Sequence, residues 1–232
     1  MELSPFYEKK IECIHCKKTF PTYKVRSKSV RVSSTASDFQ PIYLDDQVNA
    51  LFYNVFVCEH CGFSFTEDFS KYFAPGTPEL IQSEITSRWV QHSFNGERTP
   101  EKAMEAYKLA YLCASLKKEK NIIMAGLLLR VAWMYRMLDQ SAQELRFIKM
   151  ARDQYTESYS NEDYRSTQMT ETRVAYMIAE LSRRLEDYPV ATRFFSRVIE
   201  SQRNGGEPKV VEMAKQQWEL VREQRAYNQA ME

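Results

Sequence analysis

Four cysteines in the first part of the chain occur as two Cys-x-x-Cys pairs, a type and spacing suited to binding a metal. Segments 11–20 and 56–65 read IECIHCKKTF and FVCEHCGFSF, so cysteines, a histidine, a hydroxyl residue and a phenylalanine recur at one constant offset. Two thiolates from each of two matching loops complete a tetrahedral shell for a soft divalent metal. The predicted ligands are Cys13, Cys16, Cys58 and Cys61.

A closed shell of four sulfurs predicts a structural role for the ion. Zinc catalysis needs an open coordination position, which such a shell lacks. Zinc is the expected ion and iron the alternative, since four sulfurs suit either. His15 and His60 lie inside the two motifs, and we expect neither to bind the ion because four thiols are present.

Other catalytic arrangements find little support in the sequence. The glycines form neither a phosphate loop nor a dinucleotide fingerprint, and His92 has no nucleophile motif beside it. A thiol-redox protein is the third-ranked alternative, but redox Cys-x-x-Cys motifs normally begin a helix, and extended structure is expected after both motifs here. Cys113 is expected to be a buried packing residue. We therefore predict that the protein is not an enzyme.

Composition indicates a globular chain without a strong overall charge. With 232 residues, 44% of them hydrophobic, and a net charge of +1, the chain fits one large or two modest domains and has no polyelectrolyte character. The longest apolar run, 122–129, is far too short for a membrane span. We expect no membrane association and a cytoplasmic location, where reduced cysteines favour metal binding over disulfides.

The elements that must position the cysteines are short strands. We expect a loosely held segment at 1–10, a strand at 22–32, an irregular loop at 33–50 and a second strand at 51–57 that runs into the second motif. This arrangement predicts a zinc-ribbon-like metal-binding domain over residues 1–74.

Helical patterns fill the remainder, residues 75–232. Thr77-Pro78-Glu79 and Thr99-Pro100-Glu101 are helix start signals: a capping threonine, a proline in the first turn and an acid at the positive helix end. Helices are predicted near 78–94, 100–118, 120–138, 141–160, 165–186, 188–203 and 208–229, the last as a C-terminal cap. The predicted fold class is α+β, mainly α.

The helical part also contains a degenerate repeat. Segment 185–198 resembles the second half of a tetratricopeptide repeat, with Ala179 at the small-residue position of the preceding helix. The equivalent residue of another copy is Ala132, 47 positions earlier, where the usual period is about 34. We predict an antiparallel tetratricopeptide-like array with lengthened helices; an irregular bundle of amphipathic helices is the alternative.

The complete arrangement resembles a known bacterial family. Two Cys-x-x-Cys motifs, a basic strand, the segment LFYNVFVCEHCG at 51–62 and helical repeats are similar to the uncharacterised bacterial proteins grouped as domain-of-unknown-function family 2225. The resemblance covers essentially the full chain. It implies a metal-binding head on a helical interaction body, with no established activity.

Two surfaces are candidates for partner binding. The repeat register points aromatic and guanidinium side chains into a groove suited to a protein or peptide with an acidic end, although they could equally be core and solvated residues. These side chains are Trp133, Arg136, Tyr176, Arg183 and Arg184. Alternatively, the basic strand 24–31 could follow a nucleic-acid backbone or simply be a solubilising edge. Its basic residues, with those of the first motif, are Lys17, Lys18, Lys24, Arg26 and Lys28. The favoured function is a non-enzymatic interaction or scaffold protein.

Overall fold

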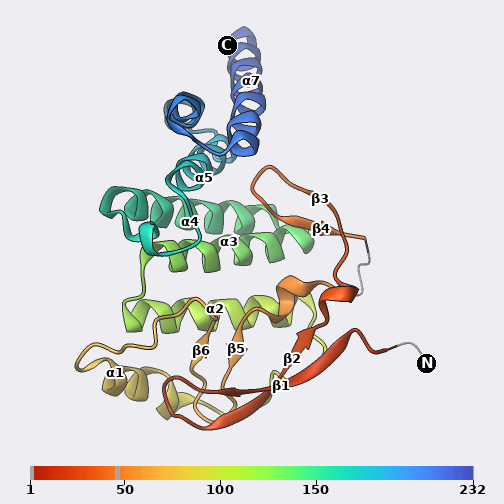
Figure 1. Cartoon of the computed structure of the whole chain (residues 1–232), viewed down its shortest axis with the longest axis vertical. Helices are drawn as coiled ribbons and strands as arrows, with labels where there is room; N and C mark the ends of the chain where they lie inside the picture. The colour runs from red at the N-terminus through yellow and green to blue at the C-terminus, as the bar shows by residue number, and fades with distance from the viewer. Residues whose placement is uncertain (1–2, 45–47, 232) are drawn as a thin grey trace.

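A computed structural model describes residues 3–44 and 48–231 and confirms the α+β, mainly α class (Figure 1). Its strands are β1 (Phe6–Glu12), β2 (Thr19–Val25), β3 (Val32–Thr35), β4 (Pro41–Tyr43), β5 (Phe56–Val57) and β6 (Ser64–Phe65). Its helices are α1 (Thr77–Glu84), α2 (Pro100–Lys117), α3 (Asn121–Met137), α4 (Ser141–Asn161), α5 (Glu171–Arg184), α6 (Tyr188–Glu200) and α7 (Pro208–Met231).

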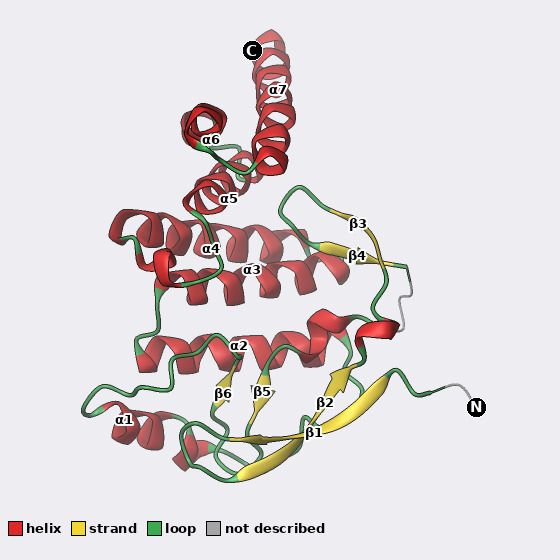
Figure 2. Ribbon diagram, in the orientation of Figure 1, coloured by secondary structure: helices red, strands yellow, loops and turns green. Residues whose placement is uncertain are grey.

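The strands form three separate antiparallel hairpins. Strands β1 and β2 pair from Phe6↔Val25 to Glu12↔Thr19, and β5 pairs with β6 through Val57↔Ser64. Each cysteine motif is therefore the turn of a hairpin, which places the two motifs in equivalent local surroundings. Strands β3 and β4 form the third hairpin, which lies beside the helices and apart from the other strands (Figure 2).

Several predicted strand boundaries are wrong. The segment at 1–10, expected to be loosely held, contains most of β1, and the strand expected at 22–32 ends with β2 where its partner β1 begins. A short 3-10 helix, Ser27–Ser29, follows it. The strand expected at 51–57 is reduced to β5, because the Asn49 side chain accepts a hydrogen bond from the Leu51 amide and starts a 3-10 turn. The loop expected at 33–50 contains the β3–β4 hairpin.

The helices follow the predicted order, with two boundaries that are clearly wrong. The helix expected at 165–186 begins at Glu171, as α5, after a separate 3-10 turn at Asp163–Ser166. Helix α2 begins as predicted, with the Thr99 hydroxyl accepting the amide hydrogen of Lys102 at 3.3 Å. The helix expected at 78–94 ends at Glu84, and after a short 3-10 turn the chain is extended at Trp89. Trp89 thereby leaves the helical surface and reaches the second cysteine motif.

Sequential helices pack against one another. Helix α2 joins them to the two hairpins that carry the cysteine turns, β1–β2 and β5–β6, which together are called the ribbon. Helix α2 contacts β5 and β6 as well as α3, and each of α3 to α6 packs on its successor. Ala103, Ala106 and Ala110 of α2 are fully buried, which allows close approach on that face. Helix α3 is apolar around most of its circumference and is buried among its neighbours. The tetratricopeptide-like register stays a prediction.

Within the described residues, none of the helices combines the length and the apolar character that crossing a bilayer requires.

Candidate metal centre

The two cysteine turns have the same backbone hydrogen bonds. In the first, the Cys13 amide donates to the Lys18 carbonyl at 3.0 Å and the Lys17 amide donates to the Cys13 carbonyl at 2.9 Å. In the second, the Cys58 amide donates to the Phe63 carbonyl at 3.1 Å and the Gly62 amide donates to the Cys58 carbonyl at 2.8 Å. The repeated sequence thus folds into a repeated local structure.

Each turn closes through a residue with a left-handed backbone. Lys17 has φ 63° and Gly62 has φ 72°, at equivalent positions directly after the second cysteine. A Cβ on Gly62 would lie 2.5 Å from the Trp89 ring, so glycine is required there by space as well as by conformation. Lys17 tolerates the conformation, and its ammonium donates to the Ile14 carbonyl at 2.9 Å.

The four cysteine sulfurs form one cluster. All four Sγ atoms lie within 4.8 Å of one another. Cys13 Sγ is 3.7 Å from Cys61 Sγ, and Cys16 Sγ is 3.7 Å from Cys58 Sγ, so each short distance joins the two turns. A sulfur tetrahedron around an ion at about 2.3 Å has edges of about 3.8 Å. The donor set therefore fits a zinc or iron ion.

The cluster needs a cation to hold four thiolates. The hydrogen bond to Cys58 raises the pKa of the Cys13 thiol to about 12. The same bond lowers the pKa of Cys58 to about 2, and hydrogen bonding to Cys13 raises the pKa of Cys61. Hydrogen bonding within the cluster therefore favours a mixture of protonated thiols and thiolate over four thiolates. A divalent ion replaces those protons when it binds.

Neither histidine of the motifs belongs to the cluster. Within the described part of the chain, the potential metal ligands that gather here are the four cysteines. His60 Nε2 lies 3.2 Å from the Thr19 carbonyl oxygen, so it joins the second turn to β2 of the first hairpin. The His15 ring lies 5.5 Å from that of Phe63, and burial lowers the pKa of His15. Both histidines support the turns around the sulfur cluster.

Side chains from outside the ribbon also hold the second turn. Trp89 Nε1 donates to the Glu59 carbonyl at 2.8 Å, and the Thr86 hydroxyl donates to the Cys61 carbonyl at 3.2 Å. These contacts were not predictable from the helical pattern of the sequence, which places both residues in one continuous helix.

Cys113 provides a further link between the ribbon and the helices. It is fully buried on α2, as expected, and its sulfur accepts a hydrogen bond from the Ser64 amide at 3.1 Å. Burial raises the pKa of the Cys113 thiol to about 12. The thiol therefore stays protonated and helps to hold β6 against α2.

The side chains predicted to line a partner groove lie together on α3 and α5, but they face a segment of the same chain. Trp133 and Arg136 hydrogen-bond to Asp38 in the loop of the β3–β4 hairpin. Tyr176 and Arg184 bond to Ser37 of that loop. Arg183 instead pairs with Glu180 of its own helix at 2.8 Å, beside this contact.

Asp38, the buried partner of these side chains, was not predicted from the sequence. It lies in a segment without clean periodicity, so only its charge beside a phenylalanine could have drawn attention to it. Whether the five predicted groove residues also bind a partner stays a prediction.

The basic residues proposed for nucleic-acid binding are spread over several local contacts. Lys24 pairs with Glu67 at 3.1 Å and lies over the Phe56 ring. Arg26 Nε donates to the Ser4 carbonyl, Lys28 is in the 3-10 turn after β2, and Lys17 bonds within its own turn. Lys18 is exposed. The charge of Lys24 is thus already balanced within the protein.

Comparison with models of protein families identifies the family to which the chain belongs. The model of the family described as "Uncharacterized protein conserved in bacteria (DUF2225)" matches residues 6–221. Searches of the curated proteins and of the solved structures found no significant match.

Proposed function

Since the chain belongs to the DUF2225 family, we propose that it is a non-enzymatic interaction protein built on a structural metal site. Its ribbon would be held by zinc on Cys13, Cys16, Cys58 and Cys61, and its helical body would bind a peptide segment of a partner protein. The observation that carries this proposal is the four-sulfur cluster between two equivalent turns.

A structural role for the ion is supported by its complete donor set. Three of the four cysteines are buried and all four come from hairpin turns, so an ion there joins two hairpins that share no strand pairing. Bound zinc would supply a cross-link between those hairpins, and structural sites of this kind contribute about 10–16 kcal/mol to folding of small domains. A reducing compartment such as the cytoplasm would keep these thiols available.

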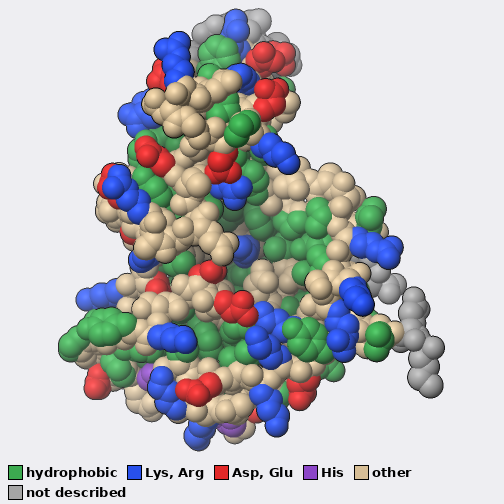
Figure 3. All heavy atoms as spheres, in the orientation of Figure 1, with side chains coloured by type: hydrophobic (Ala, Val, Ile, Leu, Met, Phe, Trp, Pro, Cys, Tyr) green, Lys and Arg blue, Asp and Glu red, His purple; other side chains and the backbone are tan. Residues whose placement is uncertain are grey.

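A role in binding peptides is supported by the shape and chemistry of the helical body. Cavities of about 770 and 790 Å³ lie on its surface, and both include apolar and cationic side chains. Figure 3 shows hydrophobic side chains in the hollow between the ribbon and the helices. Such surfaces suit an extended segment with apolar and acidic side chains.

Two measurements test this proposal. Metal analysis of the purified chain and of a Cys58→Ser, Cys61→Ser double variant should find the ion only in the unaltered chain. Binding to an immobilised library of random peptides should select apolar and acidic sequences with a shallow salt dependence.

The nucleic-acid alternative makes the opposite prediction. A fluorescent single-stranded oligonucleotide would then bind and lose affinity steeply between about 50 and 200 mM salt. That outcome, together with an absence of selected peptides, would overturn the proposed function.

A further inference from the structure

The loop of the β3–β4 hairpin occupies the helical surface as a bound peptide would. Its central residue, Asp38, is fully buried although it is charged. Arg136 Nη2 and Trp133 Nε1 donate to Asp38 Oδ2 at 2.7 and 3.0 Å, and Arg184 Nη2 is 3.6 Å from Oδ1. The Asp38 carboxylate is therefore held by ion pairs with two guanidinium groups and by a hydrogen bond from an indole.

The residues beside Asp38 are also recognised individually. The Tyr176 hydroxyl donates to the Ser37 carbonyl at 2.7 Å, and the Ser37 hydroxyl donates to Glu180 at 2.7 Å. The Phe39 ring lies 5.3 Å from the Tyr176 ring. Side chains of the helices thus contact a hydroxyl residue, an acid and an aromatic residue that follow one another in the loop.

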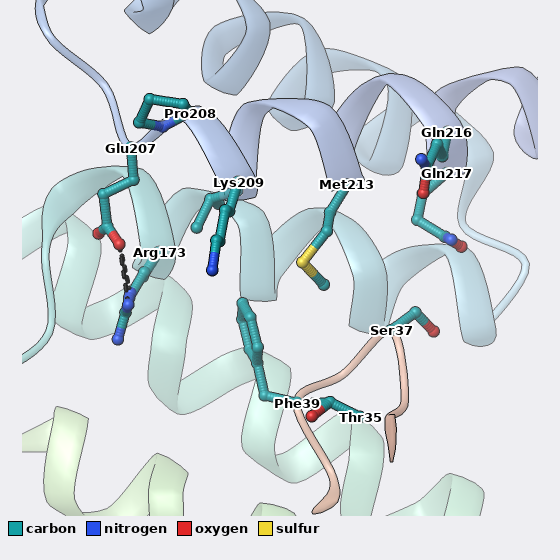
Figure 4. A pocket seen from close by; sticks show the side chains of 11 residues that line it. Thr35, Ser37, Phe39, Arg173, Glu207, Pro208, Lys209, Met213, Gln216 and Gln217 are labelled. Atoms are coloured by element: carbon teal, nitrogen blue, oxygen red, sulfur yellow. Dashed lines mark hydrogen bonds and ion pairs between the residues drawn. The ribbon is translucent and has the colours of Figure 1, made fainter. Parts of the chain in front are cut away.

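The loop fills only the middle of this surface. A cavity of about 770 Å³ lies on one side, between the loop and α7, where Phe39 and Met213 point toward each other (Figure 4). A cavity of about 790 Å³ lies on the other side, toward the ribbon. Phe39 and Arg173 line both cavities, so the groove continues past the loop in both directions.

Each cavity contains a cation that the hairpin does not use. Lys209 lines the first cavity and Arg130 lines the second, where the Arg130 guanidinium donates to the Gly126 carbonyl. Across residues 3–44 and 48–231, no carboxylate lies within ion-pair distance of either side chain. Carboxylates line the cavities too: Glu207 in the first pairs with Arg173, and Glu67 in the second pairs with Lys24 and lies beside Asp68. A segment longer than the loop, with acids directed toward Lys209 and Arg130, would complement the charges of those two side chains.

We propose that this groove is the receptor for an acidic segment of a partner protein, and that the chain's own loop at 36–40 is an intramolecular competitor for it. The partner segment presents a hydroxyl residue, a carboxylate and an aromatic residue in the positions of Ser37, Asp38 and Phe39, with further acids toward Lys209 and Arg130. This inference rests on the proposed peptide-binding function and specifies its ligand.

The internal position of the loop explains how a weak ligand could hold the groove. A tethered segment has an effective concentration in the millimolar range. Phe39 also has a left-handed backbone with φ 64°, and all four residues of β3 are exposed. The loop closes on itself through the Ala36 amide, which donates to the Gln40 carbonyl at 2.9 Å, and its side chains pack on the helices. A partner segment that lacks the left-handed residue and forms additional ion pairs would bind the groove more tightly than the loop does and displace it.

The experiment uses a chain in which residues 34–42 are replaced by a glycine-serine linker, with a labelled synthetic peptide of residues 33–43 as probe. Fluorescence anisotropy should show binding to the replaced chain at least about tenfold tighter than to the unaltered chain, because the internal loop no longer competes. A matched peptide with Asp38→Asn should bind about tenfold more weakly, since it loses the ion pairs. Metal content and circular dichroism establish that the replaced chain is folded.

A second variant covers the case in which the replaced chain does not fold. Asp38→Asn in the full chain keeps the backbone intact and removes the anchoring charge. It should increase amide hydrogen exchange across residues 33–43 and increase binding of the unaltered peptide. An Asp38→Asn chain with the exchange and peptide affinity of the unaltered chain would overturn the proposal.

The outcomes also separate this inference from the function on which it rests. If acidic library peptides bind the replaced and unaltered chains equally while the hairpin peptide does not bind, the groove function stands and the competitor role is overturned. If no peptide binds either chain, both fail. If the unaltered chain is a dimer that becomes monomeric when the loop is replaced, the loop joins two copies and the proposal is wrong.

Discussion

Arg136, which is partly exposed, and the fully buried Asp38 form an ion pair between residues that are 98 positions apart, with Arg136 Nη2 2.7 Å from Asp38 Oδ2. The pair attaches a hairpin from the N-terminal part of the chain to helices α3 and α5. It also connects with Glu144, which accepts a hydrogen bond from Arg136 Nε at 2.7 Å. The ribbon half and the helical half are therefore joined here as well as where α2 packs on β5 and β6 and where Trp89 and Thr86 hold the second cysteine turn.

Removing the charge of Asp38 should weaken the attachment of the hairpin. Asp38→Asn removes the buried carboxylate that Arg136 and Arg184 share, and breaking a buried pair typically costs about 3–5 kcal/mol. Arg136 still pairs with Glu144, and Arg184 still pairs with Glu180. We expect a loss near the lower value, because asparagine can still accept from Trp133. Urea unfolding measures the change, with Asp153→Asn as the exposed control, where we expect less than about 0.5 kcal/mol. Equal midpoints for the two variants would contradict the account.

The contribution of Asp38 should disappear in acid. Burial disfavours its charged form, but Arg136 and Arg184 outweigh burial and lower the pKa of the carboxyl. Because the native pKa is lowered, the stabilisation is complete above the unfolded pKa of about 3.9 and is lost as pH falls through the lower native value. The difference in unfolding free energy between the unaltered chain and Asp38→Asn should therefore stay constant from pH 7 to about pH 5 and shrink below about pH 4. A difference that shrinks near pH 6 would show that another group is responsible.

The two cysteine turns should respond differently to changes at equivalent positions. Gly62→Ala places a Cβ against the Trp89 ring and in a left-handed conformation, so we expect a loss of about 2–4 kcal/mol. Lys17→Gly relieves the left-handed backbone at a position without that ring, and the stability should change by less than about 1 kcal/mol. Chemical unfolding of the metal-loaded variants tests this pair. A Gly62→Ala chain as stable as Lys17→Gly would show that the Trp89 contact is unimportant.

Arg98 should be essential for the packing of the segment before β5. Its Nη1 donates to the carbonyls of Phe52 and Val55, both at 2.9 Å, and burial lowers the pKa of Arg98 to about 10. Arg98→Met keeps the length of the side chain but leaves both buried carbonyls without this donor, for an expected loss of about 1–3 kcal/mol per carbonyl. Thermal unfolding measures it against Arg88→Met, an exposed control with an expected change below about 0.5 kcal/mol. Similar melting temperatures for both variants would refute this role.

The four-cysteine cluster was predictable from the sequence because its determinants are local. Each Cys-x-x-Cys turn contains its own hydrogen bonds and its own left-handed residue, Lys17 or Gly62. The order of the helices was predictable for the same reason, since caps such as Thr99 act within one turn. The strand boundaries failed where pairing decides them, as in β2, which ends opposite the first residue of β1.

The occupied groove could not be predicted, because it depends on contacts between distant residues. Trp133, Arg136, Tyr176 and Arg184 were identified as a cluster, but nothing in their periodicity shows that Asp38 is their partner. The extended chain at Trp89 could not be predicted for the same reason. Its ring packs against Gly62 and donates to the Glu59 carbonyl, and the helical periodicity of the sequence does not show these contacts.

The central claim is that one ion held by four sulfurs shapes the ribbon, and X-ray absorption spectroscopy of the chain purified under reducing conditions tests it most directly. We predict one zinc per chain with four sulfur neighbours at about 2.3 Å; iron in the same four-sulfur shell would change the ion and leave the structural role intact. An oxygen or nitrogen neighbour completing the shell, or a folded chain without stoichiometric metal, would contradict the claim.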